Sequence, residues 1–349
     1  MKLLVVSTYP PLACGIGRYA AQQVDFLRRE GHWVDVLTPA GCDGDFQDDL
    51  YGRFRILALL KYLWAYDMAY LHFAPQFFYD TASRASRFMT SFGFLLVMLL
   101  AGKRITFMIH ETGYKIGQEG RGLLRHRIDR WYWRLAGRVV FHSTRERDTF
   151  CWFYRLKTTR ANLEVWPHDK YMVPLWPHDR AEARRRLSLE PDKLFFLCIG
   201  FVQPHKGFDR ALEAFLKTPG EHLRFKIVGS VRINWDVAHQ YAQRLHELAE
   251  QDARAEFVES FVNDEMFDMW VAAADYVVLP YREIWTSSVA ARARLYGRPL
   301  IAADTGGLAE QLTEGSMLFR DDDELVECLR RIAARTNPSP AGEPTPTPH

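Results

Sequence analysis

Residues 276–299 read YVVLPYREIWTSSVAARARLYGRP, an apolar run followed by a polar loop and then a helix-length stretch. The unbroken β-branched and aromatic run predicts a strand that is covered on both faces. Thr286, Ser287 and Ser288 stand where the helix begins, and Gly297-Arg298-Pro299 ends it. The stretch therefore predicts a strand, a loop and a helix in that order, which is the repeating unit of a parallel sheet.

The same order of strand and helix repeats along the whole chain of 349 residues. A first series of strands is predicted at residues 3–6, 33–37, 68–73, 105–110 and 139–142, and a second at residues 194–200, 225–229, 257–260, 276–281 and 300–304. Residues 166–180, between the two series, contain three prolines and show no periodicity, which is typical of a connector. We therefore expect an α/β protein with two doubly wound parallel sheets that face each other across a cleft.

The length agrees with two domains, each large enough for a core of its own. We place the first domain at residues 1–170, a linker at residues 171–190, the second domain at residues 191–336 and a disordered proline-rich tail at residues 337–349. The tetrapeptide Trp-Pro-His-Asp occurs twice in this region, at residues 166–169 and 176–179. It is read either as a ligand site or as a chance recurrence in an aromatic-rich connector, and the second reading is favoured.

The formal net charge is only +2, but residues 101–160 carry nine more positive than negative charges, so the rest of the chain is acidic. A local basic segment indicates an anionic partner for one surface and gives no reason to expect a nucleic acid. The five cysteines are widely spaced and contain no Cys-x-x-Cys pair, which favours a reducing compartment over a zinc site. The apolar run at residues 3–6 is too short for a signal peptide, so we expect a cytoplasmic protein.

Loops that follow strands are the candidate sites, because doubly wound sheets bind ligands beyond the carboxyl ends of their strands. Ser287 and Ser288 begin a helix after the strand at residues 276–281, and such a start can bind an anion as well as cap the helix. Lys206 stands just before another predicted helix, where it can neutralise a phosphate or be an ordinary surface lysine. Gly15 and Gly17 follow the first strand and let the backbone approach a ligand closely.

Taken in order, these loops resemble the retaining glycosyltransferases of family 4, which have the GT-B fold of two Rossmann-like domains. The resemblance covers nearly the whole chain, and its motifs are Thr8-Tyr9-Pro10-Pro11 with Gly15-Ile16-Gly17, Gly200 to Gly207, Phe225 to Gly229, Leu279-Pro280-Tyr281-Arg282-Glu283, Gly297-Arg298-Pro299, Asp304-Thr305-Gly306-Gly307-Leu308 and Glu310. It implies that the second domain binds a nucleotide diphosphate sugar, with Gly229 on the donor side, and that the first holds the acceptor. It also implies retention of the anomeric configuration.

Two positions depart from the family pattern. Phe201 stands where the family has an arginine, so Lys206 alone remains of the usual basic pair. The family has a glutamate that holds the ribose; counting back from Gly297 places Arg292 at its position, and counting forward from Glu283 places Ala291 there, neither of which is acidic. We expect Arg292 to contact the donor.

Residues 280–282 together with Ser287, Ser288 and Val289 are similar to a branch of the family that carries Pro-Tyr-Arg and Ser-Gly-Val. In that branch the first amides of the helix take the diphosphate, and Glu283 lies near the transferred sugar.

His110 ends a predicted strand and matches the family histidine near the reacting sugar, where it can hydrogen-bond a sugar hydroxyl and position the donor. His72 and His142 also end strands and are weaker candidates of the same kind. Acidic clusters such as residues 321–324 are read as solvated helix caps, so we expect no metal and no other cofactor.

A basic aromatic segment runs from Arg121 to Arg138. Its predicted membrane contacts are Arg125, Arg127, Arg130, Trp131, Trp133 and Arg134, which combine cations with aromatic anchors as helices on anionic lipid do. The alternative is a solvated basic face whose tryptophans pack inward. The apolar residues 88–101 are too few for a membrane span and favour a buried or interfacial helix.

Two functions fit the sequence. The first is a retaining hexosyltransferase that moves a sugar from a nucleotide diphosphate sugar to a glycan or lipid-linked acceptor at the cytoplasmic membrane face, in polysaccharide or glycoconjugate synthesis. The second is a GT-B binding subunit without turnover, suggested by Phe201 and Arg292. We favour the enzyme, because Lys206, Glu283 and His110 are present together.

Overall fold

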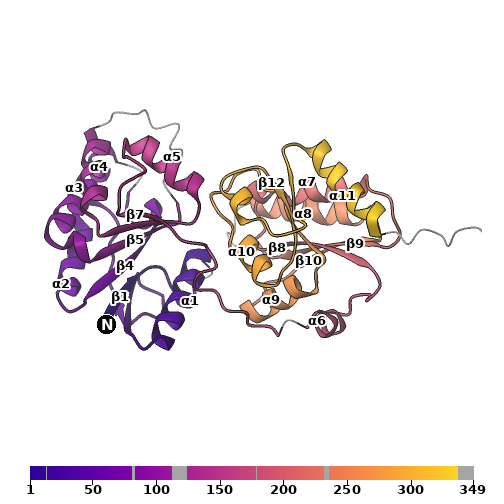
Figure 1. Ribbon diagram of the computed structural model, residues 1–349, viewed down its shortest axis with the longest axis horizontal. Helices are drawn as coiled ribbons and strands as arrows, with labels where there is room; N and C mark the ends of the chain where they lie inside the picture. The colour runs from indigo at the N-terminus through magenta and orange to yellow at the C-terminus, as the bar shows by residue number, and fades with distance from the viewer. Residues whose placement is uncertain (13, 81–82, 112–123, 178, 232–235, 337–349) are drawn as a thin grey trace, which may run out of the picture. The chain divides into compact units, whose positions relative to one another are not determined.

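The computed structural model describes residues 1–12, 14–80, 83–111, 124–177, 179–231 and 236–336 (Figure 1). The predicted disorder of residues 337–349 falls outside these residues, as do Arg121 and the side chain of Arg125. The chain divides into two compact units, unit 1 at Met1–Val173 and unit 2 at Pro174–His349. All five cysteines are buried and free of disulfides.

Unit 1 is built on a seven-stranded, wholly parallel sheet in the order β3-β2-β1-β4-β5-β6-β7. Its strands are β1 Lys2–Val6, β2 Trp33–Thr38, β3 Phe46–Gln47, β4 Met68–Phe73, β5 Ile105–Ile109, β6 Arg138–Phe141 and β7 Leu163–Val165. Its helices are α1 Gly15–Arg29, η1 Arg53–Leu59, α2 Leu60–Leu63, η2 Pro75–Phe77, α3 Arg84–Ala101, η3 Gly102–Arg104, α4 Leu124–Leu135 and α5 Thr144–Tyr154. Helices α3 and α4 cover one face of the sheet and α1 the other (Figure 1).

Unit 2 has a six-stranded parallel sheet in the order β10-β9-β8-β11-β12-β13. Its strands are β8 Leu194–Ile199, β9 Leu223–Gly229, β10 Ala255–Glu259, β11 Tyr276–Leu279, β12 Leu300–Ala303 and β13 Met317–Phe319. Its helices are α6 Arg180–Arg186, η4 Pro204–Lys206, α7 Phe208–Leu216, α8 Asp236–Ala249, α9 Asp264–Ala273, α10 Ser288–Leu295, η5 Leu308–Gln311 and α11 Asp322–Thr336. Helices α7 and α11 pack together on one face, and α9 and α10 on the other.

Both units are therefore doubly wound parallel sheets, which confirms the predicted fold class. The central strands are buried almost completely, as the burial of every residue of β5 and β12 illustrates. Burial on both faces removes the alternation of polar and apolar residues, so the unbroken apolar runs in the sequence identify these strands.

The predicted linker at residues 171–190 contains a regular element. Helix α6 lies within it, begins at the cap residue Asp179 and buries Ala183 and Arg184. The Arg184 guanidinium donates to the carboxylate of Asp275 (2.6 Å) and to the backbone carbonyls of Pro191 and Lys193. These bonds attach α6 to unit 2, so the predicted linker contains a helix that belongs to unit 2.

The two copies of Trp-Pro-His-Asp have different surroundings. Trp166 belongs to unit 1, where its indole N–H donates to Glu164. Trp176 is buried in unit 2, where its amide donates to the hydroxyl of Tyr296 (3.1 Å). The two tryptophans of the repeat therefore have different roles, and His178 lies outside the described residues.

Candidate functional site

The strand order of unit 2 reverses between β8 and β11. From β8 the chain runs outward through β9 and β10, whereas β11 is followed by β12 and β13 on the other side. The loops after β8 and β11 therefore leave the sheet side by side. This is the point at which doubly wound sheets bind ligands.

Two glycines allow the backbones around these loops to touch. Gly207 has a φ of 65°, and a Cβ atom there would overlap the carbonyl oxygen of Pro280. A Cβ on Gly229, at the end of β9, would overlap the carbonyl oxygen of Gly200. A glycine at position 229 is thus needed for the close packing of the two strand ends. Its contact with the donor stays a prediction.

At the start of α10, both the hydroxyl and the amide of Ser287 are already hydrogen-bonded within the protein. The Ser287 hydroxyl accepts from the amide of Ala290 (3.3 Å), while the Ser287 amide donates to Gln311 (2.8 Å). Among the described residues, the amides of Ser288 and Val289 have no hydrogen-bond acceptor. Ser288 is exposed and the Val289 side chain is buried. The anion site predicted here consists of the amides of Ser288 and Val289 with the Ser288 hydroxyl.

Lys206 lies at the end of η4, in the loop after β8. Its ammonium is 4.2 Å from the centroid of the Tyr281 ring, which comes from the loop after β11. No carboxylate of the described residues forms an ion pair with it. A positive charge that has no counterion in the described part of the chain therefore lies where the loops after β8 and β11 meet.

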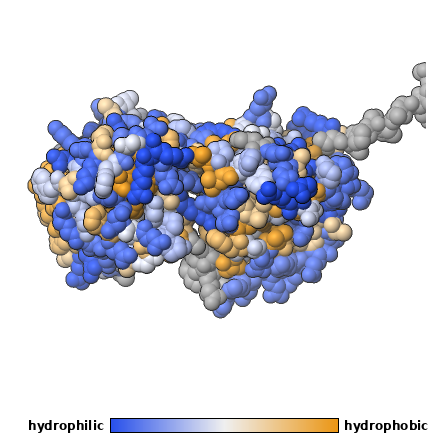
Figure 2. All heavy atoms as spheres, turned by 90° about the horizontal axis from the view of Figure 1, so that it is seen from below, coloured by the Kyte–Doolittle hydropathy of each residue, from blue (hydrophilic) through white to orange (hydrophobic). Residues whose placement is uncertain are grey.

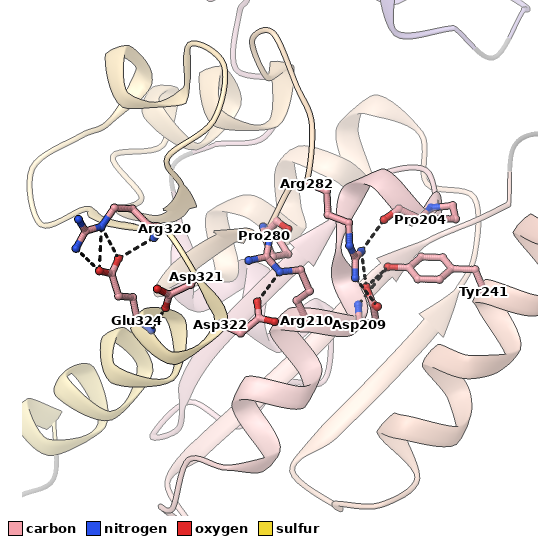
Figure 3. Close-up of polar contacts among 10 residues, drawn as sticks. All are labelled: Pro204, Asp209, Arg210, Tyr241, Pro280, Arg282, Arg320, Asp321, Asp322 and Glu324. Carbon is pink, nitrogen blue, oxygen red and sulfur yellow. Dashed lines mark hydrogen bonds and ion pairs between the residues drawn. The ribbon is translucent and has the colours of Figure 1, made fainter.

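An ion pair ties these two loops together (Figure 3). Arg282 donates to both carboxylate oxygens of Asp209 (2.8 and 2.7 Å) and to the carbonyl of Pro204 (2.7 Å). Tyr241 donates to the same carboxylate (2.7 Å). Burial raises the pKa of Asp209, but the hydrogen bonds from Arg282 and Tyr241 outweigh it, and the net shift of the pKa is downward. The ionised pair fixes residues 204–209 against the loop that carries Glu283.

Arg292 does not take part in this site, and the predicted contact with the donor ribose is wrong. It is buried in the core on α10 and forms an ion pair with Asp268 of α9. The Tyr296 hydroxyl donates to the same carboxylate (2.9 Å). The side chain points towards α9 because that face of α10 packs on the neighbouring helix.

The acidic cluster at residues 321–324 is engaged in capping and ion pairs (Figure 3). Asp321 accepts from the amide of Glu324 (2.9 Å), Asp322 accepts from Arg210 (2.6 Å), and Glu324 pairs with Arg320. Within the described part of the chain, no group of three or more His, Cys, Asp and Glu side chains is arranged to hold a metal ion.

In unit 1 the strand order reverses between β1 and β4, and Gly15 and Gly17 lie just after β1 at the start of α1. A Cβ on Gly15 would meet nothing within 4 Å, whereas one on Gly17 would lie 3.1 Å from the carbonyl oxygen of Thr8. Gly15 is therefore open to a ligand, and Gly17 serves the packing of α1 on the loop.

Four histidines surround Tyr19 at the carboxyl end of this sheet. His72 ends β4, His110 and His142 follow β5 and β6, and His168 comes after β7; their ring centroids lie 5.8, 5.1, 5.2 and 5.2 Å from that of Tyr19. Burial lowers the pKa of His72 to about 3 and that of His142 to about 4. Burial and the neighbouring histidines lower the pKa of His110 as well. His72, His110 and His142 are therefore neutral near pH 7.

The predicted membrane residues divide between surface and core. Trp131 is 56% exposed and lies under the guanidinium of Arg134 (5.3 Å to the ring centroid). Arg127 is exposed and Arg130 is half-buried. Trp133 is completely buried against Phe107, so its predicted membrane contact is wrong: on α4 it is two residues from Trp131 and faces the opposite side.

A second apolar surface of unit 1 lies on the helix that contains the apolar residues 88–101. Helix α3 exposes Phe88, Phe92, Leu99 and Leu100. Hydrophobic side chains appear at the end of unit 1 formed by α2 and α3, on the left of the view (Figure 2). Residues 84–104 form one helical stretch long and apolar enough to cross a membrane, but 44% of it is buried inside the protein, and core helices of soluble proteins have the same length and composition.

Two family models match the chain, one in each unit. A model of the glycosyltransferase family 4 matches residues 13–168, and a model of the group 1 glycosyl transferases matches residues 193–335. Together they take in most of both units. The chain belongs to the group 1, family 4 glycosyltransferases.

Curated relatives of this family 4 chain include D-inositol 3-phosphate glycosyltransferases. That of Nocardia farcinica is 29% identical over 188 residues, which are 52% of this chain and 40% of the relative. That of Streptomyces bingchenggensis is 35% identical over 143 residues, 39% of this chain and 31% of the relative. The chain thus spans no more than about two fifths of the length of these relatives.

Solved structures with the same fold cover almost all of this family 4 chain. Sucrose-phosphate synthase from Thermosynechococcus elongatus has a TM-score of 0.69 at 18% identity, covering 96% of this chain and 90% of the other. Anabaena HepE in complex with UDP has a TM-score of 0.68 at 15% identity, with 97% and 91% covered. These similarities show that the fold is GT-B.

Proposed function

We propose that this chain is a glycosyltransferase that moves a sugar from a nucleotide diphosphate sugar to an acceptor, with retention of configuration. The observation that carries the proposal is the Lys206 ammonium at the reversal point of the unit 2 sheet, together with the amides of Ser288 and Val289 at the neighbouring strand end. Among the described residues, none forms an ion pair with Lys206 or accepts a hydrogen bond from these two amides. A cation and a helix start are the groups that bind a diphosphate.

In this reaction, Lys206 and the amides of Ser288 and Val289 would stabilise the diphosphate as it leaves. Negative charge grows on the diphosphate as the bond to the sugar breaks, and fixed N–H donors and a cation stabilise that charge more strongly than they stabilise the bound donor. In this proposal Lys206 and the α10 amides supply the stabilisation without a metal ion. Glu283, which is exposed in the loop after β11, and His110 keep the sugar-positioning roles that the family resemblance gives them.

The acceptor in this proposal is a glycan or a lipid-linked glycan, and the reaction serves polysaccharide or glycoconjugate synthesis at the cytoplasmic membrane face. One solved structure of the same fold is WaaG, a glycosyltransferase involved in lipopolysaccharide biosynthesis. The curated relatives named for D-inositol 3-phosphate make a phosphorylated polyol the other acceptor to test.

We also propose that unit 1 docks on an anionic membrane surface. The exposed apolar residues of α3 are accompanied by Arg84 at the start of the helix and by Lys103 and Arg104 at its end. Trp131 and Arg134 on α4 supply a further aromatic and cationic pair. Apolar side chains rimmed by cations match the interface of an anionic bilayer.

Replacing Lys206 with alanine tests the enzyme proposal. We expect Lys206→Ala to lower turnover of the donor by about 10²-fold or more, because one charge-stabilising donor is lost. Lys217→Ala is the matched control, since Lys217 is exposed at the far end of α7. Release of nucleoside diphosphate from a panel of nucleotide sugars measures the effect. Equal turnover by the two variants would contradict the proposed site.

A binding subunit without turnover is the second candidate, favoured by Phe201 at the position where the family has an arginine. Calorimetric binding of a nucleotide sugar, without hydrolysis or transfer to any acceptor of a panel, would establish this second function. Transfer that depends on Lys206 would exclude it.

A further inference from the structure

We propose that Gln23 and His72 are positioning residues that hold His110 in a single tautomer, with the proton on Nε2 and the lone pair on Nδ1. The tautomer follows from unit 1 alone. Its consequence for sugar transfer rests on the proposed function.

The three side chains form a chain of hydrogen bonds across three elements. Gln23 on α1 places its amide oxygen 2.7 Å from Nε2 of His72, near the end of β4. Nδ1 of His72 lies 2.9 Å from Nε2 of His110, directly after β5. Gln23 and His72 are wholly buried, and the His72 and His110 rings stack with an angle of 8° between their planes. Water therefore cannot replace either bond to His72.

The positions of the protons on the two histidine rings follow from the Gln23 oxygen at one end of the series of hydrogen bonds. An amide oxygen only accepts, so Nε2 of His72 carries a proton. A neutral imidazole has one such proton, which makes Nδ1 of His72 an acceptor. Nε2 of His110 must then donate to it. The remaining nitrogen of His110, Nδ1, presents a lone pair.

Both rings have to be neutral for this sequence of bonds. Burial lowers the pKa of His72 to about 3, and burial together with the charges of His72, His142 and His168 lowers the pKa of His110. If His72 were protonated, its Nδ1–H would face the Nε2–H of His110, and the hydrogen bond between the two rings would be lost. The low pKa values thus agree with the polarity of the hydrogen bonds.

The consequence for the proposed reaction is a defined partner for His110. A lone pair on Nδ1 accepts a hydrogen bond from a sugar hydroxyl, and it cannot donate one to a sugar ring oxygen or to a phosphate. His110 is half-buried, with Nε2 committed to His72. The hydrogen bonds from Gln23 through His72 to His110, here called the relay, therefore leave His110 able to bind and position a sugar hydroxyl.

Nitrogen-15 NMR of the histidine rings tests the relay. In the wild-type protein at pH 7 we expect both His72 and His110 to show the Nε2–H pattern, with signals assigned by their loss in His72→Asn and His110→Gln. Gln23→Met removes the amide oxygen, and the His110 signals should move to a mixture of the two tautomers. Gln22→Met changes a neighbouring glutamine of α1 outside this hydrogen-bonded chain and should leave them unchanged.

A His110 ring with its proton on Nδ1 in the wild type, or an unchanged His110 pattern in Gln23→Met, would overturn the relay. If sugar transfer is detected, Gln23→Met should lower kcat about tenfold at unchanged donor affinity, while Gln22→Met keeps the wild-type kcat. If the wild type transfers no sugar, the proposed function fails, and the NMR pattern still decides the relay on its own.

Discussion

The cationic side chains of unit 2 differ in whether they already form an ion pair within the protein. Arg282, Arg210 and Arg292 each pair with a carboxylate, whereas Lys206 contacts the Tyr281 ring. A paired arginine is committed to the fold, and a lysine without a counterion is free to bind an anion. This contrast separates the structural cations from the proposed donor contact.

Arg292 gives the sharpest test of that separation. Removing one partner of a buried ion pair leaves a buried charge uncompensated, so Arg292→Met should lower the free energy of unfolding by about 3–5 kcal/mol. Arg331→Met breaks an exposed pair with Glu327 and should cost less than about 1 kcal/mol. Denaturant titration of both variants measures the difference. If Arg292→Met were as stable as the wild type but bound nucleotide poorly, the result would support the ribose contact first expected for Arg292.

Single residues show which features of the candidate site are visible in the sequence and which are not. Lys206 and Ser288 could be proposed because their loop positions between strand and helix are visible in the sequence. Asp209 and Tyr241 were missed because they lie 73 and 41 residues from Arg282 and meet it only through the sheet topology. Arg292 was misread because alanines and arginines are interleaved along α10, so the sequence does not show which face is buried.

Among the elements, ten strands were predicted within one or two residues, and the three missed strands share one property. β3, β7 and β13 are two or three residues long, and each lies at an edge of its sheet. Edge strands bury less surface than central ones, so their sequences carry a weaker apolar signal. The sheet order, and with it the reversal point, therefore depends mostly on strands that the sequence does reveal.

Helix α3 carries the prediction for the membrane surface. Phe92→Glu with Leu99→Glu should reduce binding to vesicles containing anionic phosphatidylglycerol by at least about tenfold, since a charge on the apolar face opposes insertion. Trp33→Glu is the control, because Trp33 is 66% exposed at the start of β2. Co-sedimentation at low and high salt measures the binding, which should weaken with salt for the wild type. Equal binding by the two variants would contradict docking through α3.

At the scale of the whole molecule, the two units should respond differently to acid. His72 and His142 are buried in unit 1, and burial lowers their pKa values to about 3 and about 4. Between the unfolded value of about 6.5 and these folded values, only the unfolded chain binds the protons, so stability falls as the pH falls. The two groups together should cost unit 1 about 4 kcal/mol at pH 5 relative to pH 7.

Hydrogen exchange of unit 1 amides at pH 7 and pH 5, corrected for the intrinsic rate, checks this loss. His142→Phe should reduce the pH dependence by about a third, because burial lowers the pKa of three histidines of unit 1, His72, His110 and His142, and one of them is gone. His239→Asn, which changes an exposed histidine of unit 2, should leave it unchanged. A pH dependence that His142→Phe leaves intact would assign the acid sensitivity to other groups.

A donor diphosphate is proposed to bind where the loops after β8 and β11 of unit 2 meet. Amide hydrogen exchange with and without a bound nucleotide diphosphate sugar tests this site, because the amides of Ser288 and Val289 are the proposed ligands. We expect slower exchange in peptides covering residues 200–207 and 285–291, and loss of that protection in Lys206→Ala. Protection confined to residues 188–195, 224–226 and 253–256, which line a pocket where β8, β9 and β10 begin, would contradict it.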